Sequence, residues 1–172
     1  MEIIGKRSPD SEIALSFFNS THEALGGMGL IGGQALDLEF RTPKPDFGFA
    51  EVYRKKVGFR DLWTMCAHFK TASLFRLSLY AGILTAQVDQ ETIEAVCRCG
   101  DRLGLVFQLL DDEEDEDYSH VNETASYQTL LTKKQRIDEA KYQQKEWQRE
   151  LNEAMGHKGK ELSKYFDLIV PI

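Results

Sequence analysis

The 172-residue sequence lacks several features that would place it outside the ordinary cytoplasm. A membrane-spanning helix needs about 20 consecutive, mostly apolar residues, and no stretch of this sequence meets that requirement. The first residues, MEIIGKRSPDSE, show none of the charged start, apolar stretch and small-residue cleavage site that define a signal peptide. The three cysteines are an odd number and do not indicate a disulfide framework. We therefore expect no membrane span and a reducing, cytoplasmic location.

Alternating strand patterns bounded by turns are also missing, so the predicted fold class is all-α. The length predicts one domain over residues 1–172. Apolar residues recur at helical spacing in five segments: residues 9–39, 60–85, 89–117, 126–154 and a short last helix that ends at Pro171. The second and third segments are apolar on most faces, which predicts central helices of a bundle, whereas the polar fourth segment should lie outside.

The net charge of −7 comes from one place in the sequence. Residues 111–117 are seven consecutive acids, and outside this run the acidic and basic residues balance at 21 each. A chain without a basic face lacks the electrostatic footprint of a nucleic-acid-binding protein, so no nucleic-acid partner is expected. The acidic run indicates either a bound cation or a solvated acidic spacer.

A glycine-rich segment stands within the first predicted helix. Its sequence GMGLIG at residues 27–32 matches the dinucleotide-binding pattern G-x-G-x-x-G, but that fingerprint needs a preceding strand, and the residues before it are helical in pattern. Glycine costs about 1 kcal/mol relative to alanine inside a helix, so the cluster needs a packing or site-building reason. We expect Gly26, Gly29 and Gly33 to share one helix face and to let a neighbouring backbone approach closely.

Isolated polar residues interrupt two of the apolar helical segments. Gln34 and Asp37 follow the glycines in the first segment, and Lys70 and Thr71 lie inside the second, after Phe69. Lys70 has two interpretations. Its ammonium group either extends along the helix to the surface or is a cation held in a cavity to bind an anion.

The sequence FQLLDDEED at residues 107–115 passes from an apolar helix into acids without a turn residue. Helical geometry places Gln108, Asp111, Asp112 and Asp115 on one face. Acids near a helix C-terminus are unfavourable by about 0.3–1 kcal/mol each, and carboxylates one turn apart repel, so a compensating cation is expected. Oxygen ligands without cysteine or histidine suit Mg²⁺, which binds through one or two carboxylates together with substrate phosphates. Spacing alone also allows a solvated acidic patch.

Three segments, in this order and spacing, resemble the trans-prenyltransferases, which are the farnesyl, geranylgeranyl and longer polyprenyl diphosphate synthases. They are GGQALDL at residues 32–38, FKTASLFRLSLYAG at 69–82 and GLVFQLLDDEED at 104–115. The resemblance extends over about residues 12–170 and implies an isoprenoid synthase-type helical bundle, of which this chain holds the later helices. It also implies Mg²⁺-dependent head-to-tail condensation of an allylic diphosphate with isopentenyl diphosphate.

The same resemblance implies roles for residues of these segments. The ligands that would hold Mg²⁺ against the allylic diphosphate are Asp111, Asp112 and Asp115. The residues that would contact that diphosphate are Lys70 and Thr71. The residues that would line the isopentenyl site are Phe107 and Gln108, and those that would shape the cavity are Gln34 and Asp37. The expected catalytic residues are Lys70 and Asp111.

The resemblance covers only the later half of the family pattern. The first aspartate-rich motif of that family, with its adjacent arginines, precedes the GGQ segment, and nothing in this sequence supplies it. The sequence SYQTLL at residues 126–131 resembles the family segment after the second aspartate-rich motif. The lysines that precede its tyrosine in the family pattern are missing, since the first lysine after Asp115 is Lys133. We therefore expect this chain to be inactive alone.

Three hypotheses stay open at this point. The chain is an enzyme half that pairs with a chain supplying the other half, a truncated or non-catalytic subunit that modulates a prenyltransferase, or a Mg²⁺- and diphosphate-binding helical protein without turnover. A half-bundle exposes apolar helix faces, so association as a homodimer or hetero-oligomer is expected in any of them.

Overall fold

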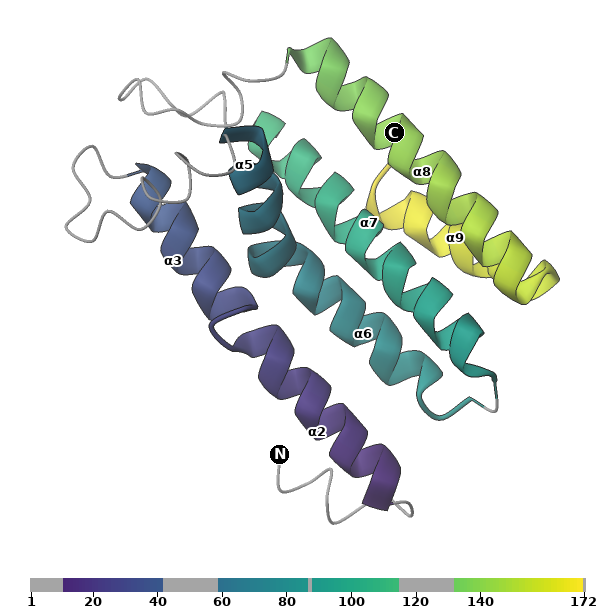
Figure 1. The fold of residues 1–172 in the computed structure, drawn as a ribbon. Helices are drawn as coiled ribbons and strands as arrows, with labels where there is room; N and C mark the ends of the chain where they lie inside the picture. The colour runs from purple at the N-terminus through teal and green to yellow at the C-terminus, as the bar shows by residue number, and fades with distance from the viewer. Residues whose placement is uncertain (1–10, 42–58, 87, 115–131, 172) are drawn as a thin grey trace.

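The computed structural model describes residues 11–41, 59–86, 88–114 and 132–171, with only the backbone described for residues 40, 41, 59–62 and 112–114. These ranges contain helices and no strand, which confirms the predicted all-α class (Figure 1). The elements are α2 (Ser11–Leu25), α3 (Leu30–Arg41), α5 (Phe59–Ala67), the π-helical turn η1 (His68–Ala72), α6 (Ser73–Ile83), α7 (Gln90–Glu114), α8 (Lys133–Met155) and α9 (His157–Ile169). None of these helices is long and apolar enough to span a membrane.

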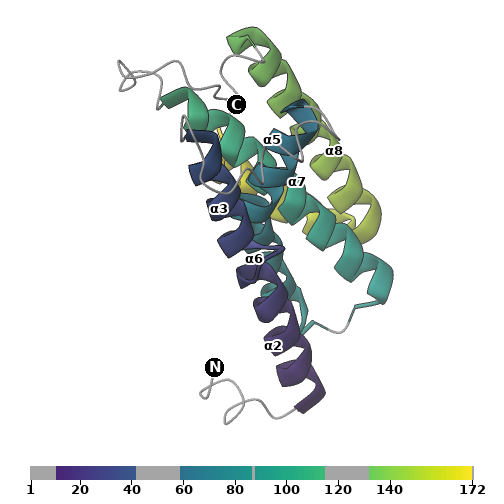
Figure 2. The same ribbon diagram turned by 60° about the vertical axis from the view of Figure 1, so that its left-hand side comes forward.

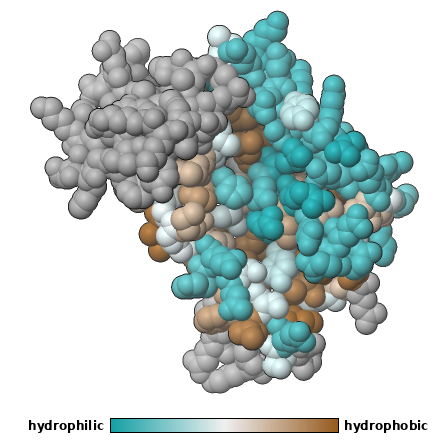
Figure 3. Space-filling view, viewed as in Figure 1, coloured by the Kyte–Doolittle hydropathy of each residue, from teal (hydrophilic) through white to brown (hydrophobic). Residues whose placement is uncertain are grey.

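The helices lie roughly side by side in the order in which the chain forms them. Helices α2 and α3 follow each other along one side, the continuous run of α5, η1 and α6 lies beside them, and α7 lies between α6 and α8 (Figures 1 and 2). Helix α9 folds back on α8. The second and third predicted helices are therefore central, as expected. Hydrophilic side chains cover the α8 side of the molecule (Figure 3).

The first predicted helix, residues 9–39, is divided in the structure at its glycines. The chain turns after α2, where the Gly29 N–H donates to the Gly26 carbonyl oxygen at 3.0 Å. A Cβ at Gly29 would lie 2.5 Å from the Ala24 carbonyl carbon and closer still to its oxygen, so this turn requires glycine. The expectation that Gly26, Gly29 and Gly33 share one helix face is therefore wrong, because only Gly33 meets another helix.

The last two helices differ from the prediction at their ends. Helix α8 begins after a capping box in which the Thr132 side chain accepts from the Gln135 N–H and Gln135 accepts from the Thr132 N–H. Residues 126–131, predicted to be helical, lie outside the described residues. Only Gly156 lies between α8 and α9, and its φ of 57° lets the chain reverse before α9 begins.

The main core lies between α7, α8 and α9. It is formed by apolar side chains that these helices turn toward one another, and its fully buried members include Leu103, Val106, Trp147, Leu151 and Phe166. The Trp147 and Phe166 rings meet edge to face, with centroids 6.0 Å apart. The buried face of the polar helix α8 supplies Ala140, Trp147 and Leu151 to this core, together with the polar residues Arg136 and Gln143.

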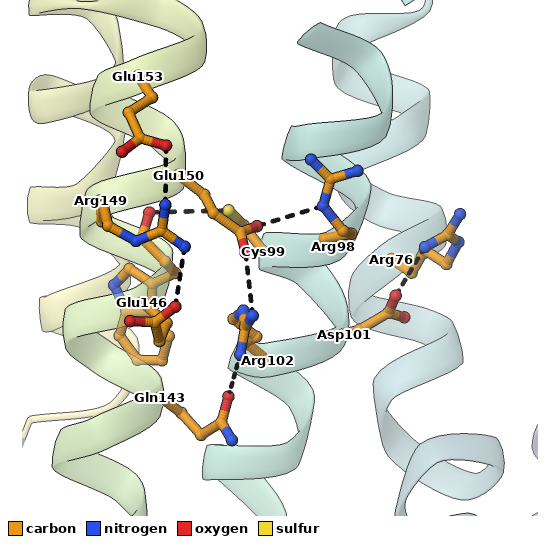
Figure 4. Close-up of polar contacts among 11 residues, drawn as sticks. Arg76, Arg98, Cys99, Asp101, Arg102, Gln143, Glu146, Arg149, Glu150 and Glu153 are labelled. Carbon is orange, nitrogen blue, oxygen red and sulfur yellow. Dashed lines mark hydrogen bonds and ion pairs between the residues drawn. The ribbon is translucent and has the colours of Figure 1, made fainter. Parts of the chain in front are cut away.

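An ion-pair network ties α7 to α8 beside this core (Figure 4). Glu150 reaches between two arginines of α7, accepting from Arg102 Nη2 at 2.9 Å and from Arg98 Nε at 3.4 Å. Arg102 Nη1 also donates to Gln143 Oε1 at 2.6 Å. Burial, followed by the nearby Glu150 carboxylate, raises the pKa of the Cys99 thiol to about 12. Such a thiol is a poor nucleophile and serves as a small packing residue.

Candidate functional site

The segment that carries Lys70 and Thr71 forms a π-helical turn. In η1 the Ser73 N–H donates to the carbonyl oxygen of His68, five residues earlier, instead of the usual four. The Ser73 hydroxyl donates to the Phe69 carbonyl oxygen at 2.7 Å. Single π-helical turns inside α-helices are uncommon and are frequently found at functional sites. The predicted second helix therefore changes from α-helical to π-helical geometry at the residues that include Lys70 and Thr71.

Lys70 turns toward α3. Its Nζ lies 2.9 Å from Asp37 Oδ2, and both side chains are only partly exposed, at 22% and 19%. The ammonium group is thus held between two helices instead of extending into solvent along its own helix. Such a partly buried pair experiences less screening than a surface pair, so its geometry is better maintained.

Thr71 turns the other way, toward α7. Its hydroxyl donates to Gln108 Oε1 at 2.6 Å, and Gln108 is buried. Two adjacent residues of η1 therefore reach acceptors on the two helices that flank it. Four residues that the sequence singled out separately, Lys70, Asp37, Thr71 and Gln108, form one connected group.

Glycines allow this close packing. A Cβ at Gly33 of α3 would lie 2.5 Å from the Lys70 Cα and closer still to its backbone nitrogen, which confirms the predicted close approach at this glycine. A Cβ at Gly104 of α7 would lie 3.0 Å from the Ala72 Cβ and closer still to its Cα. Gly104 stands inside a long apolar helical segment, and a glycine at such a position is the signal in the sequence that indicates this close packing.

The other site residues expected from the sequence lie outside this connected group, or their side chains are not described by the structure. Asp111 is exposed on α7, one turn beyond Gln108. Phe107 is 38% exposed, and its ring centroid lies 5.4 Å from that of Phe75. Gln34 is exposed on α3, outside the group around Lys70. The side chain of Asp112, and Asp115 entirely, lie outside the described residues. Among the side chains that are described, no group of three metal-ligating residues occurs.

A second polar group lies beside η1. An open cavity of about 300 Å³ between α5, α7 and α8 is lined in part by His68, Arg98, Asp101 and Arg102. The charged groups around it are largely paired within the protein, since Arg76 Nη1 lies 2.6 Å from Asp101 Oδ2 and the two lining arginines share Glu150. The cavity therefore has little net charge with which to attract an anion.

Residues of this chain match a known protein family. The family model of the polyprenyl synthetases matches residues 14–124, which is more than half of the chain. This chain belongs to the polyprenyl synthetase family. Its match spans α2 to α7 and includes every residue of the group around Lys70.

Individual members of the family show the same relationship. This polyprenyl synthetase chain is 33% identical over 89 residues to geranylgeranyl pyrophosphate synthase 3, chloroplastic, of Arabidopsis thaliana, an alignment that covers 52% of this chain and 22% of the relative. It is 30% identical over 86 residues to the geranylfarnesyl diphosphate synthase of Methanosarcina mazei, with coverage of 50% and 25%.

Solved structures show the fold. An FPP/GFPP synthase from Zymomonas mobilis superposes with a TM-score of 0.74 at 22% identity, covering 96% of this chain and 55% of that one. A geranyltransferase from Helicobacter pylori superposes with a TM-score of 0.72 at 24% identity, covering 99% and 54%. The fold is the isoprenoid synthase helical fold, and this polyprenyl synthetase chain spans about half the length of these structures. The aligned segment is about a quarter of the length of the curated relatives.

Proposed function

We propose that this chain forms one part of a trans-prenyl diphosphate synthase, the part in which Lys70 and Thr71 contact the diphosphate of an allylic substrate. The observation that carries the proposal is the connected group on η1, where a partly buried ammonium and a hydroxyl are set side by side between two helices. Groups fixed in this way are already oriented when an anion binds, so little reorganisation is needed.

The proposed reaction is a head-to-tail condensation. The allylic carbon–oxygen bond breaks and its electron pair leaves on the diphosphate. The double bond of isopentenyl diphosphate then attacks the allylic cation, and loss of a proton forms the new double bond. Lys70 would stabilise the negative charge that develops on the leaving diphosphate. Phe107 and Gln108 would line the isopentenyl site, and Gln34 and Asp37 would shape the cavity.

The proposed metal ligands begin on α7 and are of the residue type that Mg²⁺ prefers. Asp111 offers an exposed carboxylate in the last described turns of α7, and Asp112 follows it directly. Together with Asp115 these are hard oxygen donors without a thiol or imidazole, the set that Mg²⁺ prefers. When bound there, Mg²⁺ would neutralise charge on the diphosphate oxygens.

Lys70→Ala tests the proposal directly. A hydrogen bond to a charged group contributes about 1.5–3 kcal/mol, so binding of inorganic pyrophosphate in the presence of MgCl₂ should weaken about 10- to 100-fold. Isothermal titration calorimetry measures the Kd, with Lys70→Arg retaining part of the affinity and the exposed Lys145→Ala as a matched control on α8. An unchanged Kd for Lys70→Ala would show that this lysine does not contact the diphosphate.

The chain is proposed to act with a second polypeptide region that supplies the remaining half of the site. It spans about half the length of the solved synthases, and its sequence holds no counterpart of the first aspartate-rich motif. Large apolar side chains are exposed along α2, α3 and the turn between them: Leu15, Phe18, Leu25, Met28, Ile31 and Leu38. Apolar patches are visible in Figure 3. Exposed apolar surface of this kind favours association, as a homodimer or a hetero-oligomer. A reducing, cytoplasmic location belongs to the same proposal and is supported by three buried cysteines that form no disulfide with one another.

The half-length coverage also favours a second candidate, a non-catalytic subunit that binds a catalytic prenyltransferase and modulates it. In either case we expect the isolated chain to give no prenyl product from an allylic diphosphate, isopentenyl diphosphate and Mg²⁺, because half of the diphosphate clamp is missing. Extraction of radiolabelled product provides the measurement, and a full-length farnesyl diphosphate synthase is the positive control. Turnover by the isolated chain would contradict the expectation. A changed rate when the chain is added to a catalytic synthase would favour the subunit.

A further inference from the structure

We propose that Gly33 of α3 and Gly104 of α7 are positioning residues that hold η1 in the geometry needed to present Lys70 and Thr71. The inference rests on the proposed function, in which these two side chains contact a diphosphate. It concerns two glycines that lie against the backbone of η1 and the Ala72 β-carbon and that would have no contact with the ligand themselves.

The two flanking helices meet η1 with the same arrangement. On α3, Gly33 admits the backbone of Lys70, and Asp37, four residues later, accepts from the Lys70 ammonium. On α7, Gly104 admits Ala72, and Gln108, again four residues later, accepts from the Thr71 hydroxyl. Residues at i and i+4 lie on the same helix face. Each helix therefore combines, on one face, a gap for the backbone of η1 and an acceptor for its side chain.

Lys70 and Thr71 are consecutive residues of the π-helical turn, and their side chains reach acceptors on different helices. Inserting one extra residue into a helical turn rotates everything that follows by about 100° relative to a regular α-helix. The turn also weakens the regular backbone pattern, and the Ser73 hydroxyl supplies an additional donor to the Phe69 carbonyl. A regular helix has better hydrogen-bond geometry, so close packing on both sides is what favours the π-helical turn here.

A side chain at either glycine would collide with atoms that cannot rotate away. At Gly33 the neighbours are the backbone nitrogen and Cα of Lys70 and the carbonyl carbon of Phe69. The backbone of η1 would have to move, whereas the hydrogen bonds from Lys70 and Thr71 tolerate only a few tenths of an ångström before they weaken. A displacement of about 1 Å in a positioned group can cost about 100-fold in function.

Calorimetry with inorganic pyrophosphate and MgCl₂ on the full chain tests the inference. Gly33→Ala and Gly104→Ala should each weaken binding about tenfold or more. Gly82→Ala is the matched control, because Gly82 lies in α6 with nothing within 4 Å of a Cβ, and its affinity should stay unchanged. Leu151→Ala, in the core far along the chain from η1, is the control for lost stability: it should lower the melting temperature but leave the Kd unchanged in the folded chain.

If the glycine variants do not fold, two serine variants that remove only a hydroxyl group test the positioning role instead. Ser73→Ala removes a buried hydroxyl that donates to the Phe69 carbonyl oxygen at 2.7 Å and lies 3.3 Å from the Ala24 carbonyl oxygen of α2. Ser78→Ala removes an exposed hydroxyl that donates to the Leu74 carbonyl oxygen within regular α6. Ser73→Ala should weaken binding about threefold or more because η1 loses a neutral hydrogen bond, while Ser78→Ala should leave the Kd unchanged.

The outcomes separate this inference from the proposed function. If Lys70→Ala weakens binding but both glycine variants, or Ser73→Ala where those do not fold, bind like the unmodified chain, the positioning role is wrong and the proposed function stands. If the affinity falls equally for Leu151→Ala, the glycines act on stability alone and the inference is also wrong. If the unmodified chain does not bind pyrophosphate, or Lys70→Ala binds equally well, the proposed function fails, and the inference that rests on it fails too.

Discussion

Replacing Trp147 by alanine should lower the free energy of unfolding by about 3–5 kcal/mol, a large part of the stability of a chain of this size. Trp147 is fully buried and lies at the centre of the contact between α7, α8 and α9. Helix α8 is polar on its other faces, so this aromatic side chain provides much of the apolar area that attaches it to the bundle. Its removal would leave a cavity that Phe166 and Leu151 can only partly fill.

Urea unfolding followed by circular dichroism measures this loss. Tyr142→Ala is the matched control, since Tyr142 is an aromatic residue of the same helix that is 55% exposed, and it should change stability little. Trp147→Phe separates volume from polarity. The buried indole Nε1 has no hydrogen-bond partner among the described residues, so this variant removes no such bond and should cost less than the alanine variant. A loss below about 1 kcal/mol for Trp147→Ala would contradict the assigned core.

The helices were predictable because their apolar spacing is dense and repeats at helical intervals. The residues at which the helices begin and end were harder to predict. The sequence TKKQ at residues 132–135 is a capping-box signature that would have placed the start of α8 correctly. The division between α2 and α3 has a weaker signal, because the glycines there are needed where the chain meets its own preceding turn, at Ala24, and periodicity does not reveal such a contact.

The sequence allowed the residues of the candidate site to be predicted, but it did not allow their contacts in space to be predicted. Lys70 and Asp37 are 33 residues apart, and no periodic pattern within one helix relates them. Only the resemblance to a family placed them at one site. The π-helical turn could not be predicted either, since it depends on packing against two helices that the chain forms before and after it. The glycines that permit this packing were visible, but only their neighbours in space explain them.

The geometry of the Lys70 group also limits what the described part of the chain can do alone. Lys70 and Thr71 supply one ammonium and one hydroxyl, and the Asp37 carboxylate beside them partly neutralises the ammonium. A diphosphate carries several negative charges, which one partly neutralised lysine cannot balance in a site shielded from water. The affinity of the site for diphosphate should therefore depend on Mg²⁺ held by the acidic residues at the end of α7.

Asp111→Ala is accordingly expected to abolish the Mg²⁺-dependent part of pyrophosphate binding. Removing one of the carboxylates proposed to hold Mg²⁺ takes away a charged ligand for which water is a poor substitute. The affinity of the variant in MgCl₂ should fall to the level that the unmodified chain shows in EDTA, which we expect to be about 100-fold weaker or more.

Calorimetry with inorganic pyrophosphate, in MgCl₂ and in EDTA, makes this comparison for each variant. Asp138→Ala is the control, because Asp138 is an exposed aspartate of α8 whose removal changes the net charge equally. The comparison decides between the two interpretations of the acidic run. If Asp111→Ala retains the full effect of Mg²⁺, Asp111 is not a metal ligand, and the seven acids are a solvated patch. If Asp138→Ala loses as much affinity, net charge accounts for the effect. Loss confined to Asp111→Ala, with helicity unchanged, would place the metal at the end of α7, one turn beyond the Gln108 that holds Thr71.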